Sequence, residues 1–150
     1  MTGIDIGSGA FEERGFIGRR YAYEAANVSP PLRWSGVPEE AKELVLLCED
    51  PDAPSGSFVH WVVVGIDPRS DGTGEGQVPP GGTELVNGFG ERGWGGPHPP
   101  PGDDPHRYVF RLYALSGPCV LPEAPRAEQV HEAVEKARVA EGALVGLYRR

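Results

Sequence analysis

One histidine and two nearby carboxylates are the side chains of this 150-residue chain placed most favourably for chemistry. His60 interrupts the apolar segment 58–66, where an unsatisfied imidazole would cost about 1–3 kcal/mol. Asp50 and Asp52 precede this segment in a proline-rich turn, so a strand–turn–strand unit would bring Asp50 toward His60. A carboxylate there would orient the imidazole and stabilise its protonated form. A core histidine with an internal partner is the alternative for His60, and turn capping is the alternative for Asp52.

A glycine- and proline-rich segment, residues 95–105, leads into a second pair of polar side chains, His106 and Tyr108. Their spacing of two at the start of a predicted strand points both to the same face. Glycine lets backbone N–H groups approach an anion closely, and proline lowers the entropy cost of holding a loop in shape. With His60, these groups predict a cradle for a phosphate or a carboxylate.

The residue types alone are also compatible with two other kinds of site, a metal site and an acid–base catalytic site. His60, His106 and Asp50 form a ligand set that suits iron or zinc, and Asp50 with His60 suits acid–base catalysis. Segment 88–93 fits G-x-G-x-x-G, but the Trp-Gly-Gly-Pro run that follows cannot open the helix of a dinucleotide fold. The sequence has no nucleophile elbow, Walker lysine motif or H-E-x-x-H motif. We therefore expect no catalytic residue, no metal and no cofactor.

The charge of the chain limits its partners. It carries 22 acidic and 14 basic residues, a net charge of −8, and its pI is near 5.0. It lacks the excess of Lys and Arg that a broad nucleic-acid surface needs, and a bulk anionic membrane would repel it. A small anion remains compatible, because the local field of a pocket can oppose the net charge.

The sequence also bears on location and redox state. No segment reaches the ~20 apolar residues that span a bilayer, so we expect no membrane insertion. Residues 1–16 lack the charged and apolar regions of a secretion signal, which favours a cytoplasmic location. Cys48 and Cys119 show no C-x-x-C spacing and are expected to be free buried thiols, with one disulfide as the alternative.

Glycine (22) and proline (16) make up about a quarter of the chain and punctuate β-branched and aromatic runs, which favours a loop-rich, mainly β domain. Segments 44–48 and 58–66 predict strands buried on both faces. Segment 108–115 predicts a strand with Phe110, Leu112 and Ala114 on one face and Val109, Arg111 and Tyr113 on the other.

The other predicted elements are less regular. Residues 16–23 suggest an edge strand, and residues 142–148 suggest a short strand or a packed tail. Residues 123–139 predict the one convincing helix, with His131 solvated on its surface. The loop 67–105 is long enough to be functional or disordered. We expect a single domain over residues 1–150.

Four motifs in order resemble the phosphatidylethanolamine-binding protein family, most closely its bacterial branch described as Raf kinase inhibitor-like. They are Asn27-Val28-Ser29-Pro30-Pro31-Leu32 with Trp34, Asp50-Pro51-Asp52-Ala53-Pro54, His60-Trp61-Val62-Val63-Val64, and the segment from Gly95 to Tyr108. The resemblance covers about residues 15–150. It implies a Greek-key type β-sandwich with a C-terminal α-helix.

The resemblance also implies a site. The implied anion pocket consists of Asp50, His60, His106 and Tyr108, with Gly96, Pro99 and Pro100 at its rim. Further pocket positions are Ala53, Pro54, Phe58, His98 and Tyr148. Family members tend to have a cis bond before the proline at position 54, and bacterial relatives commonly form dimers, so a homodimer is an expectation here.

Two residues depart from the family pattern, and three hypotheses about function are compatible with the sequence. Phe58 stands where tryptophan is common, and His98 stands where bacterial relatives often carry cysteine. The leading hypothesis is a non-catalytic protein that binds a phosphate-bearing headgroup or similar anion, with affinity falling as pH rises through the histidine pKa values. The alternatives are a kinase or protease regulator acting through the pocket mouth and loop 67–94, and a metal-dependent lyase or hydrolase. The longer terminal extensions of eukaryotic members are missing, so kinase regulation is not transferred.

Overall fold

The computed structural model describes residues 3–150, which form two antiparallel β-sheets and one α-helix. The larger sheet has the strand order β6–β4–β3–β7–β8, so β3 lies at its centre. Its strands are β3 (Glu43–Asp50), β4 (Phe58–Ile66), β6 (Thr83–Glu84), β7 (His106–Leu115) and β8 (Arg138–Tyr148). The predicted strands 44–48, 58–66 and 108–115 are thereby confirmed.

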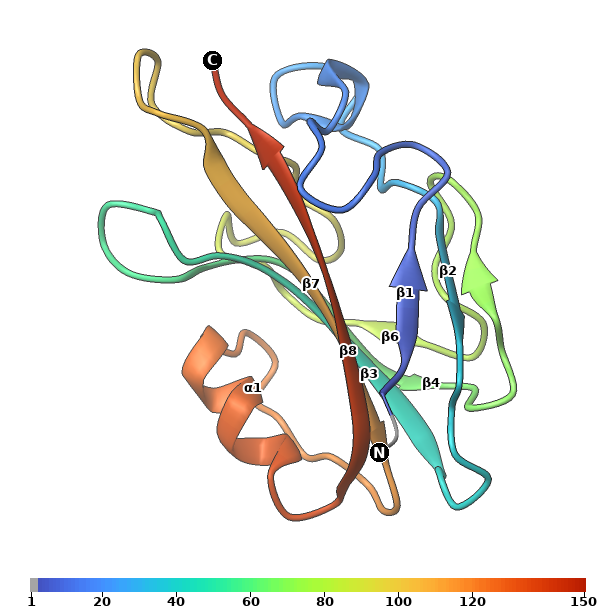
Figure 1. Cartoon of the computed structure of the whole chain (residues 1–150). Helices are drawn as coiled ribbons and strands as arrows, with labels where there is room; N and C mark the ends of the chain where they lie inside the picture. Colours follow the sequence, from blue (N-terminus) through green and yellow to red (C-terminus); the bar gives the residue numbers. More distant parts are fainter. Residues whose placement is uncertain (1–2) are drawn as a thin grey trace.

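The smaller sheet covers one face of the larger sheet, and the helix covers the other (Figure 1). The smaller sheet consists of β1 (Asp5–Gly7), β2 (Leu32–Ser35) and β5 (Gly72–Thr73) in the order β1–β2–β5. The helix α1 spans Ala127–Val134, and a 3-10 turn spans Arg19–Tyr21. This mainly β, two-sheet architecture confirms the predicted fold class.

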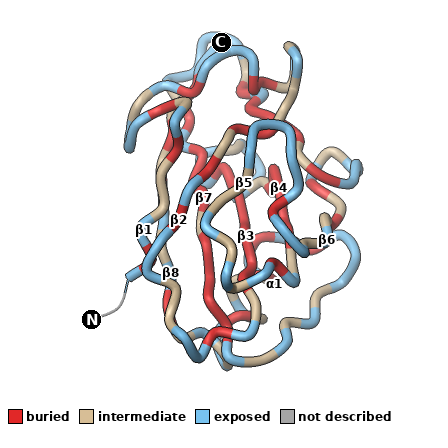
Figure 2. The backbone as a smooth tube through the Cα atoms, turned by 90° about the vertical axis from the view of Figure 1, so that its right-hand side faces the viewer, coloured by how far each residue is buried: buried red, intermediate tan, exposed pale blue. Residues whose placement is uncertain are grey.

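Strand alternation in the larger sheet divides the hydrophobic core in two, because successive side chains of a strand point to opposite faces. Leu44 and Leu46 pack toward the smaller sheet with Phe110, Leu112 and Ala114, as the alternation of segment 108–115 predicts. Val45 and Leu47 pack toward α1 with Tyr113. Strands β3, β4 and β7 are consequently the most continuously buried part of the chain (Figure 2).

The prediction of a helix over residues 123–139 is wrong at both ends. The helix covers only Ala127–Val134, and the chain returns as β8, which pairs with β7 along Arg138–Tyr148. Ten antiparallel residue pairs with β7 outweigh the helical spacing of residues 137–141, because tertiary context overrides propensity. The helix therefore precedes the last strand and is not the C-terminal element.

The N-terminal segment also differs from its prediction. Residues 16–23 form no edge strand: Phe16 makes an isolated bridge to Leu147, and the 3-10 turn follows. The Ile17 N–H donates to the Leu147 carbonyl oxygen at 2.8 Å, and the Leu147 N–H donates to that of Gly15 at 2.9 Å. The segment thus covers the free edge of β8, which would otherwise expose unpaired backbone groups.

Two covalent features complete the comparison with the sequence. The peptide bond before Pro54 is trans, because residues 3–150 contain no cis bond, so the expectation of a cis bond is wrong. Cys48 and Cys119 are free thiols; Cys48 is buried and Cys119 is half-buried.

The close contact between β8 and the N-terminal segment makes Gly142 sensitive to substitution. A Cβ atom at Gly142 would overlap the carbonyl oxygen of Ile4, whereas one at Gly117 would meet nothing within 4 Å. We expect Gly142→Ala to lower the free energy of unfolding by about 1–3 kcal/mol, the usual range for overpacking, and Gly117→Ala to leave it within about 0.5 kcal/mol. Urea unfolding followed by tryptophan fluorescence measures both, and equal stabilities would contradict the described approach of the two segments.

Candidate functional site

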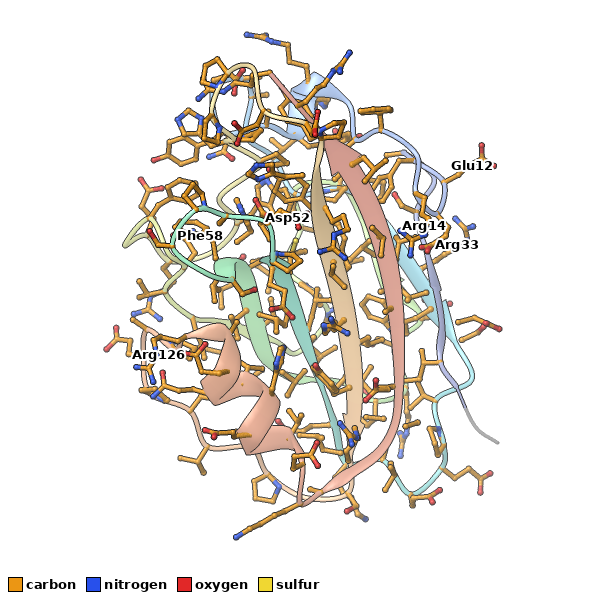
Figure 3. The ribbon with its side chains drawn as sticks, turned by 60° about the vertical axis from the view of Figure 1, so that its left-hand side comes forward. Glu12, Arg14, Arg33, Asp52, Phe58 and Arg126 are labelled. Carbon is orange, nitrogen blue, oxygen red and sulfur yellow. The ribbon has the colours of Figure 1, made fainter. Side chains whose placement is uncertain are left out.

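A cavity of about 200 Å³ lies at the end of the larger sheet where β3 finishes and β4 and β7 begin. Because β3 is antiparallel to both neighbours, Asp50 at its end lies opposite Phe58 at the start of β4, and His106 begins β7 beside it. Figure 3 shows Asp52 and Phe58 at this end of the sheet, away from Arg126 next to α1. The cavity is lined by Asp50, Ala53, Pro54, Phe58, His60, Phe89, His98, Pro99, Pro100 and His106.

Asp50 and His106 form a buried pair in the cavity wall. His106 Nδ1 lies 2.6 Å from Asp50 Oδ2, and both side chains are almost fully buried. The other Asp50 oxygen accepts a hydrogen bond from the Asp52 N–H at 2.8 Å. The expectation that Asp50 orients His60 is therefore wrong, since His106 is its partner.

The second ring nitrogen of His106 also meets a carboxylate. Nε2 lies 3.0 Å from Asp103 Oδ2, so the imidazole sits between two acids. Burial by itself lowers the pKa of His106, but hydrogen bonds to Asp50 and Asp103 outweigh it, and the pKa is raised. Burial raises the pKa of Asp50, with the His106 hydrogen bond opposing it. Carboxylate oxygens within hydrogen-bond distance of both ring nitrogens favour the protonated ring, in which both nitrogens donate.

His60 has a different partner and a different charge. Its Nδ1 lies 2.6 Å from the Gly95 carbonyl oxygen, which only accepts, so Nδ1 carries the proton and Nε2 has the free lone pair. Burial, above all, lowers the pKa of His60 to about 4, and the charges of His106 and His98 contribute. His60 is therefore neutral near pH 7 and offers the cavity an acceptor. This is the core histidine with an internal partner that the sequence left open.

The glycine-rich loop uses its N–H groups internally. The Gly95 N–H donates to the His60 carbonyl at 2.9 Å, and the Gly96 N–H donates to Asn27 Oδ1 at 2.7 Å. A Cβ atom at Gly96 would overlap the Tyr21 carbonyl oxygen, so glycine is needed there for close backbone packing. Gly96 does not line the cavity, whereas Pro99 and Pro100 of the predicted rim do.

Tyr108 and Tyr148 lie behind the cavity wall. The Tyr108 hydroxyl is fully buried and has no hydrogen-bond partner among the described residues. Burial, followed by the charge of Asp50, raises the pKa of Tyr108 strongly, so the hydroxyl keeps its proton. Tyr148 is buried opposite His106 in the β7–β8 register. Neither side chain lines the cavity.

Phe89 is a cavity residue that the sequence analysis missed. Its ring stacks on Tyr23 with centroids 4.1 Å apart and meets Phe58 edge-on at 4.8 Å. His98 completes this aromatic side, with its ring 5.2 Å from that of Tyr23 and its Nδ1 3.7 Å from Glu24. An aromatic residue inside the glycine-rich run 88–93 is the one signal that could have indicated Phe89.

His131 is not simply solvated, contrary to its prediction. Its Nε2 lies 2.7 Å from Oε2 of the buried Glu49, which also accepts hydrogen bonds from Ser57 and Arg111. This cluster ties α1 to the sheet face opposite the cavity, so His131 is remote from the candidate site. Asp52 is also bound structurally, because Arg107 donates to it through its backbone N–H and its guanidinium.

Within residues 3–150, no group of three His, Cys, Asp or Glu side chains is placed to hold a metal ion. Of the ligand set left open by the sequence, Asp50 and His106 bind each other and His60 binds Gly95. In the same part of the chain, no helix is long and apolar enough to cross a membrane.

The depressed pKa of His60 predicts a loss of stability on acidification. The unfolded imidazole has a pKa near 6.5 and the folded one about 4, so its contribution is complete above pH 6.5 and lost as the pH falls toward 4. Between pH 7.5 and pH 4.5, we expect the free energy of unfolding of the parent to fall by about 2–3 kcal/mol more than that of His60→Gln. Urea unfolding at both pH values measures this difference. An identical fall in parent and His60→Gln would refute a buried neutral His60.

The Asp50–His106 pair makes a separate prediction. Asp50→Asn removes a charged acceptor at 2.6 Å that helps to raise the pKa of His106, so this pKa should fall in the variant. Asp52→Asn is the matched control, because Asp52 contacts Arg107 and no ring nitrogen of His106. Titration of the His106 ring protons by NMR measures both variants, and an unchanged pKa in Asp50→Asn would show that the pair does not form.

Comparison with known proteins agrees with this architecture. The phosphatidylethanolamine-binding protein family matches residues 7–149. A UPF0098 protein of Methanothermobacter thermautotrophicus is 45% identical over 152 residues, covering 98% of this chain and 99% of the relative.

Two crystal structures have the same fold over nearly their whole length. The phosphatidylethanolamine-binding protein homologue CT736 of Chlamydia trachomatis is 35% identical with a TM-score of 0.88, covering 100% of this chain and 99% of that one. E. coli YbcL, described as a member of the mammalian PEBP family, is 27% identical with a TM-score of 0.89, covering 98% of both chains. The chain therefore belongs to the phosphatidylethanolamine-binding protein family.

Proposed function

We propose that the cavity binds a small anion, such as a phosphate-bearing headgroup, and performs no chemistry on it. The observation that carries this proposal is the buried His106 ring in the cavity wall, whose two nitrogens lie 2.6 and 3.0 Å from carboxylate oxygens and whose pKa is raised. A protonated ring in a poorly hydrated wall attracts an anion more strongly than one in water, because the effective dielectric constant is lower, and the carboxylates of Asp50 and Asp103 oppose this attraction. The Tyr108 hydroxyl, which does not line the cavity, has no hydrogen-bond partner among the described residues.

The size and lining of the cavity restrict the ligand. Its volume of about 200 Å³ lies below the ~300–1,000 Å³ of drug-sized pockets, which favours a headgroup or a similarly small molecule. Phe58, Phe89 and the prolines at 54, 99 and 100 provide apolar surface beside the charged wall. This combination suits an anion that carries a compact organic group.

The acid–base groups support binding and do not suit catalysis. Both oxygens of Asp50 and both ring nitrogens of His106 are already hydrogen-bonded. His60 Nε2 is free, but a pKa of about 4 makes it a weak base at neutral pH. The proposed affinity for anions therefore depends on His106, in place of the His60 cation expected from the sequence.

Calorimetric titration with inorganic phosphate and phosphoethanolamine at pH 6 tests the proposal. We expect saturable binding by the parent, a loss of roughly 10-fold or more in His106→Gln and Asp50→Asn, and weakening as pH rises through the pKa of His106. The loss follows because each substitution removes the wall cation or the carboxylate that keeps it charged. His131→Gln is the matched control, since it removes an imidazole on the opposite face. Absence of binding by the parent, or equal binding by His106→Gln, would refute the proposal.

A further inference from the structure

Asn87 is a buried asparagine, 4% exposed, directly before the loop 88–95 that brings Phe89 to the cavity wall. Its Oδ1 accepts hydrogen bonds from the N–H groups of Phe89 at 2.9 Å and of Glu91 at 3.2 Å. Its Nδ2 donates to the Gly93 carbonyl oxygen at 2.8 Å. Because the oxygen faces two donors and the nitrogen faces an acceptor, a single orientation of the amide satisfies all three bonds.

The loop 88–95 is attached to β4 at both ends. The Gly88 N–H donates to the Val59 carbonyl oxygen at 2.8 Å, and the Gly95 N–H donates to that of His60 at 2.9 Å. Residues 88–95 lie outside the strands and helices of the described structure. Glycine occupies positions 88, 90, 93 and 95, and it has more backbone freedom than any other residue. The loop therefore depends on hydrogen bonds to side chains to keep one shape, and Asn87 supplies three of them.

Two features of the cavity depend on the shape of this loop. Phe89 lines the cavity with its ring edge-on to that of Phe58, 4.8 Å away. The Gly95 carbonyl oxygen lies 2.6 Å from His60 Nδ1, which places the proton on this nitrogen and leaves Nε2 with the lone pair. Both features contact Asn87, because a Cβ atom at Gly95 would overlap the Phe89 ring and lie 3.0 Å from Asn87 Nδ2.

We propose that Asn87 is a positioning residue: its amide fixes the loop 88–95, so that Phe89 forms a cavity wall and the Gly95 carbonyl holds the His60 proton on Nδ1. Through Phe89, Asn87 determines which organic group can accompany a bound anion, and this part of the inference rests on the function proposed above. The effect on the His60 tautomer does not depend on any ligand. An asparagine with a merely structural role would affect stability and neither of these properties.

The His60 tautomer tests the inference without a ligand. At pH 7.5, the nitrogen NMR shifts of the parent imidazole should show the proton of His60 on Nδ1. Asn87→Ala removes all three bonds to the loop, so the two His60 nitrogens should instead show the averaged shifts of exchanging tautomers. Glu91→Gln is the matched control, because it changes an exposed side chain of the same loop and keeps the N–H that bonds to Asn87. This variant should keep the parent shifts.

Calorimetry with inorganic phosphate and ethyl phosphate at pH 6 tests the effect on specificity. The parent should bind the ester more tightly by about 4-fold, the contribution of one buried methylene group. Phe89→Ala should bring this ratio toward one and leave the His60 proton on Nδ1, whereas Asn87→Ala should change both the ratio and the tautomer. Glu91→Gln should keep the parent ratio.

A second variant keeps the test independent of one substitution. Asn87→Asp retains the oxygen that accepts from Phe89 and Glu91 but turns another oxygen toward the Gly93 carbonyl. It should shift the His60 nitrogens in the same direction as Asn87→Ala, and it replaces that variant if thermal unfolding shows that Asn87→Ala does not fold.

Each outcome bears on a different claim. If the Asn87 variants unfold at a lower temperature but keep the parent tautomer and the parent ratio, the role of Asn87 is only structural and the inference is wrong. The same holds if Glu91→Gln changes both readouts as much as Asn87→Ala does. If the parent binds neither phosphate, the proposed function fails, and the His60 tautomer alone decides whether Asn87 positions the loop.

Discussion

Two consecutive buried carboxylates at the end of the central strand, Glu49 and Asp50, hold the two sides of this molecule together. Because neighbouring residues of a strand point to opposite faces, Asp50 bonds to His106 at the cavity and Glu49 bonds to His131 of α1. A buried carboxylate is stable only when its charge is compensated by close donors, so each position requires its histidine and further hydrogen bonds. The site and the helix are thus anchored at neighbouring positions of β3.

The cavity follows from this compensation. The carboxylate of Asp50 favours the protonated form of the His106 imidazole in the wall, and the proposed anion site depends on that charge. The neutral state of His60 has the complementary cause: its nearest acceptor is the uncharged Gly95 carbonyl, and burial removes the water that would stabilise a charge. The pKa values of two histidines in one cavity wall are therefore shifted in opposite directions because their partners differ. The apolar rings of Phe58 and Phe89 form part of the same cavity lining.

Much of this could be predicted from local pattern. The apolar runs of β3 and β4 and the alternation in β7 identified the core strands and their faces, since a period of two is a property of the strand itself. Motif residues at the ends of these strands placed Asp50, His60 and His106 at one site. The helix boundary could not be predicted in this way, because residues 138–141 have helical spacing but gain more from pairing with β7. Phe89 was missed because it reaches the cavity from an irregular loop with no period.

The sequence by itself determined which strands form, which faces they bury, and which polar residues gather at the end of the larger sheet, because these depend on the order of residue types along the chain. Only the tertiary structure decided which hydrogen-bond partners these polar residues have. Asp50 lies within reach of both neighbouring strands, and its choice of His106 over His60 depends on the loop that brings the Gly95 carbonyl to His60. Hydrogen bonds of 2.6 Å are set by side-chain rotamers and by loops distant in sequence, and no spacing of residues along one strand specifies either.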